Sequence, residues 1–457
     1  MSDSARQAVI FPDIFSRPVI VESVPQPMSS DGGSVLLIAV DQRMQLTQSL
    51  CAVIPDERQA GKVEHPQLSL LRQRVFAIAN GYPDCNDAAR LSRDPMLLLA
   101  AQRAPCGQEA LASQPTLSRF ENAMRPRTLL AMGEQLARSV LSDQQAQRRR
   151  PPRLIHIDLD PTCDPTHGQQ EFSVFNGFYG TSCYLPLVVT VSFDAEPQKF
   201  VVAAVLRPGN AGAMKGVLGV LLRLVELIRE YFPRVRLIVR ADSAYAHPVL
   251  LECLEAGGLE YVIGLPSNAV LKRASAKLMR KARRQHRRSG QKVTLYGETR
   301  YRARSWPRAR RVVFKAEVVV HEGRAGRDND RYVVTNMKRR DWRMFAEYHG
   351  HHDMENRIKE VKNDLRMDRT SCESFLANQL RVLLTLAAAV LMQALQQKLP
   401  AAGEWAGAQM GTIREKLFKR AVRVIASVRR VVLQFSDQYP WTEVWRGLAL
   451  AVGARSG

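Results

Sequence analysis

A stretch about three-quarters of the way along the chain, YHGHHDMENRIKEVK, combines an acid with side chains that bind phosphate. If the stretch forms one helix, offsets of 3, 4 and 7 residues align four side chains along one side. These are Tyr348, His351, Glu355 and Lys362. Glu360 lies about 140° around the helix from Glu355, so Glu355 is the carboxylate of this stripe.

Two further acids follow short apolar runs that are typical of strands. Asp160 lies in LIHIDLDPT, where Asp158 is the alternative, and Asp242 ends VRLIVRAD. Asp158 and Asp160 leave the same face of a strand about 7 Å apart, and carboxylates so placed repel each other unless a cation lies between them. Asp242 reaches the same point if its strand is a neighbour of the first.

Magnesium suits these acids, because it binds hard oxygen ligands and is commonly held by one or two carboxylates plus substrate phosphate. With Glu355 on a covering helix, Asp160 and Asp242 could hold two ions about 4 Å apart, one activating an attacking hydroxyl and one stabilising the departing 3′ oxygen of a phosphodiester. That is the chemistry of strand cleavage or strand transfer. Taken singly, an aspartate at a strand end is better explained as a loop or helix cap.

Other cofactors have less support in the sequence. The cluster HGHHD at 349–353 suggests zinc through its imidazoles, but no Cys or His pair at ligand spacing completes such a site. No G-x-x-x-x-G-K-[ST] motif is present, so nucleotide hydrolysis is not indicated.

The elements that would position the acids run as strand, strand, strand, helix, strand, helix, strand. The strands are LIHIDLD, YLPLVVTVSF, FVVAAVLR, VRLIVRAD and YVIGL, and the helices span about 214–231 and 248–256. This order predicts an α/β fold, with a mixed sheet covered by helices and acids at the ends of the first and fourth strands.

Other segments flank or interrupt this core. The first 150 residues have helical periodicity and end in a basic linker at 144–153, and the apolar run at 383–395 is too short to span a bilayer and should form a core helix. The C-terminal segment alternates basic and apolar residues, which fits a second DNA-facing surface or an oligomer contact. The predicted domains are a helical DNA-binding domain at 1–150, a catalytic core at 151–265 and 337–400, a β-rich basic insertion at 266–336, and the C-terminal segment at 401–457.

Two side chains outside the core are candidates for DNA contact. In SQPTLSRFE, Ser113 or Thr116 could cap a helix that presents Arg119 to DNA, although a capped surface helix explains this segment equally well. In the insertion, Trp306 and nearby tyrosines could stack on an exposed base, with packing in the sheet as the alternative.

The composition favours a polyanion as partner. The chain has 457 residues, 66 Lys and Arg against 44 Asp and Glu, and a net charge of +22, which makes nucleic acid the leading candidate unless the basicity only reflects codon usage. Its 7 scattered cysteines include no C-x-x-C pair and fit a reducing cytoplasm. The N-terminus lacks the pattern of a signal peptide, and no membrane partner is expected.

Several segments resemble bacterial insertion-sequence transposases of the DDE type, of the group numbered thirteen-eighty, which is related to the group numbered four. They are SQPTLSRFEN, DLDPTCDPTHGQQEFSVFNGFYGTSCYLPL, RADSAYAHPVLLECLEAGGLEYVIGLPSN, YVVTN and MENRIKEVKNDL. The resemblance implies a ribonuclease-H-like core with a β-rich insertion before the last catalytic helix. It also implies Asp242 and Glu355 as the second and third acids.

The family's acid and phosphate-binding patterns map onto particular residues. Relatives show D-x-[ST] after an apolar strand, which fits Asp160 better than Asp158 as the first acid. Their Y-x2-R-x3-E-x6-K signature falls on the stripe around Glu355, with His351 in place of the arginine. Because arginine is a permanently charged, forked donor, His351 should hold phosphate less firmly, and His351→Arg should tighten DNA binding.

By resemblance, the activity is cut-and-paste DNA transposition in the bacterial cytoplasm, at the nucleoid when active. The implied partners are terminal inverted repeats and target DNA, bound by a homodimer that synapses two ends. The implied cofactor is Mg²⁺, as two ions, with Mn²⁺ as a substitute. The alternatives are a metal-dependent nuclease or resolvase on the same core, and a DNA-binding relative without catalysis.

Overall fold

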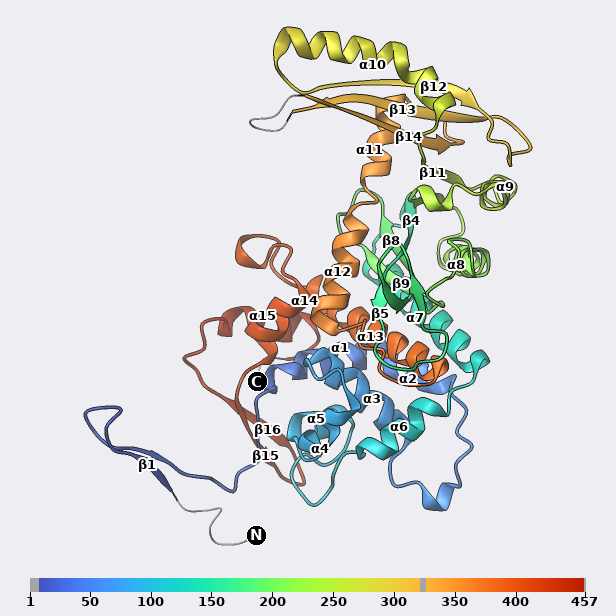
Figure 1. Ribbon diagram of the computed structural model, residues 1–457. Coiled ribbons are helices and arrows are strands. Elements are labelled where there is room, and N and C mark those ends of the chain that lie inside the picture. The colour runs from blue at the N-terminus through green and yellow to red at the C-terminus, as the bar shows by residue number, and fades with distance from the viewer. Residues whose placement is uncertain (1–7, 321–325, 456–457) are drawn as a thin grey trace.

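The computed structural model describes residues 8–320 and 326–455, and its centre is an eight-stranded mixed sheet (Figure 1). The strand order is β12-β13-β14-β11-β10-β4-β8-β9. The bounds are β4 Leu154–Pro161, β8 Leu187–Phe193, β9 Phe200–Val205, β10 Arg236–Ala241, β11 Glu260–Leu265, β12 Val293–Tyr301, β13 Arg310–Val319 and β14 Arg327–Thr335. The sheet and its helices agree with the predicted α/β class.

The directions of β4 and β10 place Asp160 and Asp242 at the same edge of the sheet, the one formed by the carboxyl ends of these two central strands. β4, β10 and β11 run parallel, whereas β8 and β9 are antiparallel to their neighbours. β10 lies directly beside β4, with Leu159 opposite Ala241. The condition under which Asp242 reaches the first acid, that the first and fourth strands are neighbours, is therefore met.

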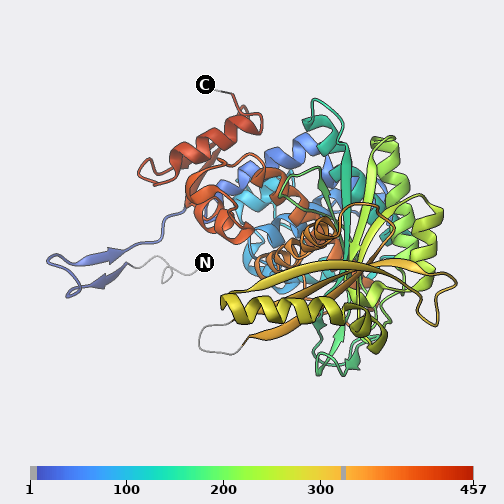
Figure 2. The same cartoon turned by 90° about the horizontal axis from the view of Figure 1, so that it is seen from above.

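Helices cover both faces of the sheet. Figures 1 and 2 show α8 (Val217–Tyr231) and α9 (Pro248–Ala256) on one side and α12 (Asp353–Leu365) on the other. Beneath the sheet, α13 (Phe375–Gln396) packs against β9 and α12. Among the described residues, α13 alone is long and apolar enough to cross a membrane, but 83% of its most apolar window is buried, as expected of the predicted core helix.

The basic insertion extends the sheet instead of forming a separate one. After α10 (Ala269–Ser289), strands β12, β13 and β14 form a meander, and β14 pairs with β11, Thr335 opposite Val262. Pairing with the insertion satisfies the backbone groups that β11 would otherwise leave open. The basic run at its start is a helix whose apolar side, including Leu271 and Met279, packs on these strands.

The region before β4 is mostly helical, as predicted. Its helices are α1 Val35–Met44, α2 Leu46–Ala52, α3 Gln67–Ala79, α4 Ala88–Leu91, α5 Pro95–Ala100, α6 Gln114–Asn122 and α7 Pro126–Gln147. Since α3 and α7 pack against α13, these helices share a core with the sheet. The predicted linker is shorter than expected, because α7 continues to Gln147 and β4 begins at Leu154. The domain boundaries stay predictions.

Smaller elements complete the chain. The strands are β1 Val9–Phe11, β2 Val19–Val21, β3 Met28–Ser29, β5 Asp164–Pro165, β6 Val174–Asn176, β7 Thr181–Tyr184, β15 Val422–Ala426 and β16 Val431–Phe435. The helices are α11 Asp341–His349, α14 Met410–Ile413 and α15 Thr442–Ala451. The short 3₁₀ and π turns are η2 Gly32–Ser34, η3 Ala60–Lys62, η4 Cys85–Asp87, η5 Ser243–Tyr245, η6 Gly403–Trp405 and η7 Arg414–Phe418.

Candidate active site

The three predicted acids gather at the carboxyl end of β4 and β10. Asp160 lies near the end of β4, Asp242 directly follows β10, and Glu355 lies in the first turn of α12. Burial raises the pKa of Asp160 to about 7; His351 opposes the shift, while the nearby carboxylates of Asp242 and Glu355 add to it. Because the charges of two other acids raise the pKa of Asp160, all three carboxyl groups lie in one site of concentrated negative charge.

Asp242 is held in place by the backbone that follows it. Its carboxylate accepts the N–H of Ala244 at 3.0 Å and so caps η5. Burial raises the pKa of Asp242, and the hydrogen bond from Ala244 only partly opposes this. The two aspartates are therefore fixed by the sheet, whereas Glu355 is exposed and comes from a separate helix.

The chemistry of these donors fits a divalent cation. Oxygen ligands in a site that disfavours their own ionisation are neutralised by a bound ion of high charge. Nevertheless, among the described residues no three Asp, Glu, His or Cys side chains already lie close enough together to hold a metal. The carboxylates of Asp160, Asp242 and Glu355 thus share one edge without forming a closed set of ligands.

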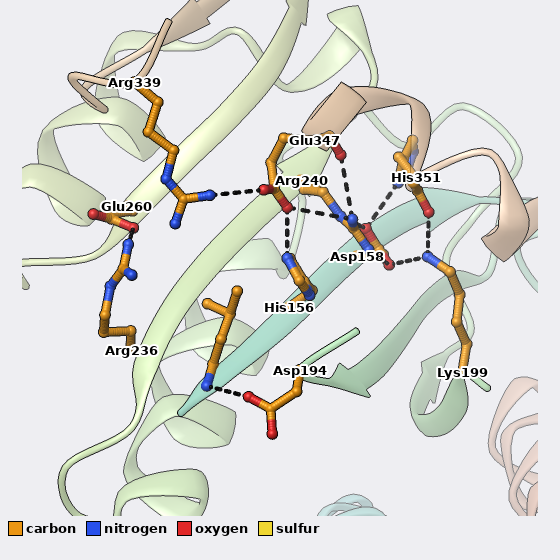
Figure 3. A network of polar contacts seen from close by, with 12 residues as sticks. His156, Asp158, Asp194, Lys199, Arg236, Arg240, Glu260, Arg339, Glu347 and His351 are labelled. Atoms are coloured by element: carbon orange, nitrogen blue, oxygen red, sulfur yellow. Dashed lines mark hydrogen bonds and ion pairs between the residues drawn. The ribbon is translucent and has the colours of Figure 1, made fainter. Parts of the chain in front are cut away.

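Asp158, the alternative first acid, is buried in ion pairs (Figure 3). It is 0% exposed and accepts hydrogen bonds from the guanidinium of Arg240 at 2.7 and 2.9 Å and from Lys199. Burial favours its neutral form, but the hydrogen bond from His351 and the charges of Arg240 and Lys199 outweigh burial and lower the pKa. Because its oxygens already have partners, Asp158 is a poor metal ligand, which leaves Asp160 as the candidate.

A buried charge network extends from Asp158 to the helices that lead to Glu355 (Figure 3). Arg240 also donates to the backbone oxygen of Glu347 at 3.2 Å, and the Glu347 carboxylate lies 2.5 Å from His156. Lys199 donates to the backbone oxygen of Gly350 at 2.6 Å. These contacts connect β4, β9 and β10 to the end of α11, and we call Asp158, Lys199, Arg240, Glu347 and His351 the buried charge network.

The predicted single helix around Glu355 is wrong. α11 ends at His349 and α12 begins at Asp353, with a turn at 350–352 between them. The hydrogen bond from His351 N–H to the Tyr348 oxygen, at 3.0 Å, is the short i to i−3 kind that closes such a turn. Glu355 and Lys362 still share α12, and Glu360 faces the other way, where it accepts from Met410 N–H at 2.8 Å.

Sequence comparison identifies the family of the chain. Residues 11–453 match the family model described as transposase DDE domain group 1. The chain belongs to the DDE transposases of insertion sequences. This membership implies nuclease and transposition activity, and members generally use divalent metals. No curated protein matches the chain.

Tyr348 and Lys362 of the transposase both lie near the backbone beside the acids. A Cβ added at Gly264 of β11 would lie 2.8 Å from the Tyr348 hydroxyl and 2.9 Å from Ser243 N, so this hydroxyl lies at the end of β10. Burial, and then the charge of Asp242, raise the pKa of Tyr348. Lys362 donates to the backbone oxygen of Cys163 at 2.5 Å and so holds the segment that follows Asp160.

Two predicted DNA contacts of the transposase are buried. His351 is 5% exposed, with its Nδ1 3.3 Å from Asp158, so it does not offer its ring to phosphate. Trp306 is 4% exposed and packs edge-on against Tyr301 at 5.6 Å, so it cannot stack on an exposed base. Trp306 instead packs in the sheet, which is the alternative that the sequence left open.

Arg119 of the transposase lies on the surface of α6, as expected. Ser113 occupies the N-cap position of α6 but makes no capping hydrogen bond with its side chain. The Arg119 guanidinium contacts Pro115 O and Thr116 Oγ1, both at 3.3 Å. These contacts are local and leave the exposed arginine available to a ligand.

The sequence prediction missed the cations of the buried charge network. Arg240 is 5% exposed within a strand whose other residues are mainly apolar, and Lys199 is 4% exposed just before β9. A charged residue inside an apolar central strand requires a buried partner, and that signal was present in VRLIVRAD. The identity of the partner, Asp158, depends on which strands are neighbours.

Proposed function

We propose that this transposase binds the terminal inverted repeats of its insertion sequence and catalyses strand cleavage and strand transfer in cut-and-paste transposition. The observation that carries the proposal is the shared position of Asp160, Asp242 and Glu355 at one edge of the sheet. Within a DDE transposase family that matches residues 11–453, these acids are the proposed catalytic set.

The proposed catalytic core is ribonuclease-H-like. Support comes from β4, β8 and β9 as an antiparallel set, followed along the chain by α8, β10, α9 and β11, with β10 parallel to both β4 and β11. The insertion lies between β11 and the helix that carries Glu355, where the resemblance places it.

The proposed cofactor is Mg²⁺, as two ions, for which Mn²⁺ can substitute. When bound, the ions would supply the positive charge that activates an attacking hydroxyl and offsets the charge on the departing 3′ oxygen. Asp160, Asp242 and Glu355 supply the carboxylate oxygens that would hold the ions. Lys362 and Tyr348, at the same edge, position the DNA end, so the chain's own contribution is the alignment of the phosphodiester with the acids.

Basic side chains at the surface support DNA as the substrate. The outer side of α10 carries exposed cations and no acid. They are Lys272, Arg273, Lys277, Arg280, Lys281, Arg283, Arg284, Arg287 and Arg288. Such a row fits the spaced charges of a phosphate backbone. With Arg119 on α6, it extends the proposed DNA contact beyond the catalytic edge, and a cytoplasmic homodimer that synapses two ends is the proposed active form.

The test uses a labelled DNA duplex that carries the element's end, an unlabelled target plasmid, and the full chain with Mg²⁺ or with EDTA. We expect nicking at the element end and joining of the labelled strand to the plasmid in Mg²⁺ only. Nicking without joining would support the nuclease or resolvase alternative. Binding of the end with no nicking in Mg²⁺ or Mn²⁺ would support the non-catalytic alternative.

A further inference from the structure

The hairpin of β1 and β2 is an arm that stands away from the rest of the protein. Figures 1 and 2, which differ by a 90° turn, both show it projecting from the body. Each strand has only the other as a sheet partner among the described residues, with Val9 opposite Val21 and Ile10 opposite Ile20. We call residues 8–24 the arm.

The arm is apolar on both faces. Large apolar side chains of the arm and the adjoining β3 are 44–68% exposed, and they are Val9, Ile10, Phe11, Ile14, Phe15, Ile20, Val21, Val24 and Met28. Because side chains alternate along a strand, Val9 and Ile10 lie on opposite faces, and a strand that is apolar on both faces is normally covered on both. A two-stranded hairpin alone is at best marginally stable in water.

The exposed area is large enough for a specific interface. The exposed apolar residues together present on the order of 900 Å², and one partner contributes about 800 Å² to a standard protein interface. An apolar surface of this size on a soluble chain indicates a partner.

The charge of the arm distinguishes among partners. Within the arm, Asp13 and Glu22 outnumber Arg17, whereas the whole chain has a net charge of +22. A slightly acidic, apolar arm does not suit DNA or an anionic lipid surface, because both repel carboxylates. It suits a basic protein surface that is itself apolar in part.

The hairpin of β15 and β16 is such a surface. Residues 419–435 contain no acid, and three of their five Lys or Arg residues are exposed: Arg423, Arg429 and Arg430. Ile425 and Val431 are each 39% exposed, and Val428 in the turn between the strands is fully exposed. We call these three residues, with the basic residues around them, the receptor patch.

The receptor patch lies beside the base of the arm. β3 pairs with the first residues of β15, and Val424 N–H donates to Pro27 O at 2.9 Å, so Ile425 directly follows the β15 residues that pair with the base of the arm. Pro25 and Pro27 restrict the connecting segment to extended conformations, which carry the arm away from its own patch.

We infer that the arm of each protomer docks on the receptor patch of a second copy of the chain. Because the patch adjoins the arm's base, a two-fold axis near that base brings each arm to the other's patch, as a self-complementary interface requires. The inference rests on the proposed homodimer and names the segments that form it.

Light scattering of the full chain at micromolar concentration tests the inference. We expect a dimer for the natural chain and a monomer for Ile10→Asp/Ile20→Asp, since charges on one face of the arm oppose its burial. The matched control is Leu130→Asp, which changes a side chain of α7 that is 67% exposed and should stay dimeric. A dimeric arm variant, or a monomeric natural chain, would overturn the inference.

A photo-crosslinking residue at position 15 identifies the docking surface. In a mixture of tagged and untagged full chains, we expect crosslinks from one copy to residues 422–435 of the other. Crosslinks to DNA, to lipid vesicles or to the same copy alone would overturn the inference. Nicking of a labelled DNA end by the same preparations tests the proposed function separately. If the natural chain does not nick the end, the proposed function is refuted, whatever the crosslinks show.

Discussion

Asp158 and Asp160 lie two residues apart on β4, and the protein surrounds the first with cations and the second with other acids. Asp158 is paired with Arg240 and Lys199 in the interior, and its pKa is lowered. Asp160 lies at the end of the same strand near Asp242 and Glu355, and its pKa is raised to about 7. The charge of Asp158 is therefore neutralised by the protein itself, whereas the charge of Asp160 and its neighbouring acids is not.

The difference shows how one strand both holds the fold and forms the site. The buried charge network ties β4, β9 and β10 to the turn before α12, so it fixes the helix that carries Glu355. The acids beyond it repel one another when they are ionised, and a bound cation would relieve that repulsion. The four predictions that follow test this division between the buried charge network and the acids.

The largest expected effect is on cleavage by Glu355→Gln. Loss of this carboxylate should reduce cleavage of a labelled DNA end by about 10³-fold or more, because the acid set would lose one of its three members. Glu360→Gln, in the same helix, is the matched control and should keep cleaving, since Glu360 faces Met410 and Gln396 instead of the acids. Equal cleavage by the two variants would refute the assignment of Glu355.

The next effect is on stability. Asp158→Asn should lower the free energy of unfolding by about 3 to 5 kcal/mol, because it leaves Arg240 and Lys199 buried without a counter-charge. Urea denaturation without divalent ions measures it. Stability equal to that of the natural chain would show that the pairs of Asp158 do not hold the fold.

Asp160→Asn should raise the free energy of unfolding, whereas Asp158→Asn lowers it. The folded protein raises the pKa of Asp160 from 3.8 to about 7, so its contribution to stability is full below pH 4 and is lost as the pH rises through 7. The variant cannot ionise and should be more stable than the natural chain by roughly 1 to 3 kcal/mol at pH 8 without divalent ions. The gain should disappear at pH 4, and denaturation at both values checks this.

The smallest effect concerns His351. Because its ring is buried against Asp158, His351→Arg should change affinity for the element's end at pH 8 by less than about twofold. This expectation replaces the tighter binding predicted from the family signature. A gain of tenfold in an electrophoretic mobility shift would show that position 351 reaches phosphate.

Much of the fold followed from local patterns. The five core strands were predicted because their apolar runs are short and rich in Val and Ile, and α13 because its apolar run is long. The break between α11 and α12 was not predicted, because His351 has its partner in Asp158, 193 residues away. A local helical pattern does not contain that contact.

The candidate site shows the same limit. The positions of Asp160 and Asp242 followed from strand order, whereas Glu355 was selected by the spacing of a single helix that the turn at 350–352 interrupts. The choice between Asp158 and Asp160 rested on resemblance alone. Burial of Asp158 against Lys199 and Arg240 now supports Asp160 on physical grounds. Trp306 was uncertain for a related reason, since no sequence pattern distinguishes an aromatic side chain packed in a sheet from one on its surface.

The most direct test of Asp160 as a metal ligand is to replace each aspartate of β4 by cysteine and to ask whether Mn²⁺ restores DNA cleavage. A thiolate is a softer ligand than a carboxylate and accepts Mn²⁺ more readily than Mg²⁺. Cleavage of a labelled DNA end by Asp160→Cys should be undetectable in Mg²⁺ and should recover at least tenfold in Mn²⁺, while Asp158→Cys should show no such dependence on the metal. Rescue of Asp158→Cys, or an Asp160→Cys variant equally inactive in both metals, would contradict the assignment of Asp160 as a metal ligand.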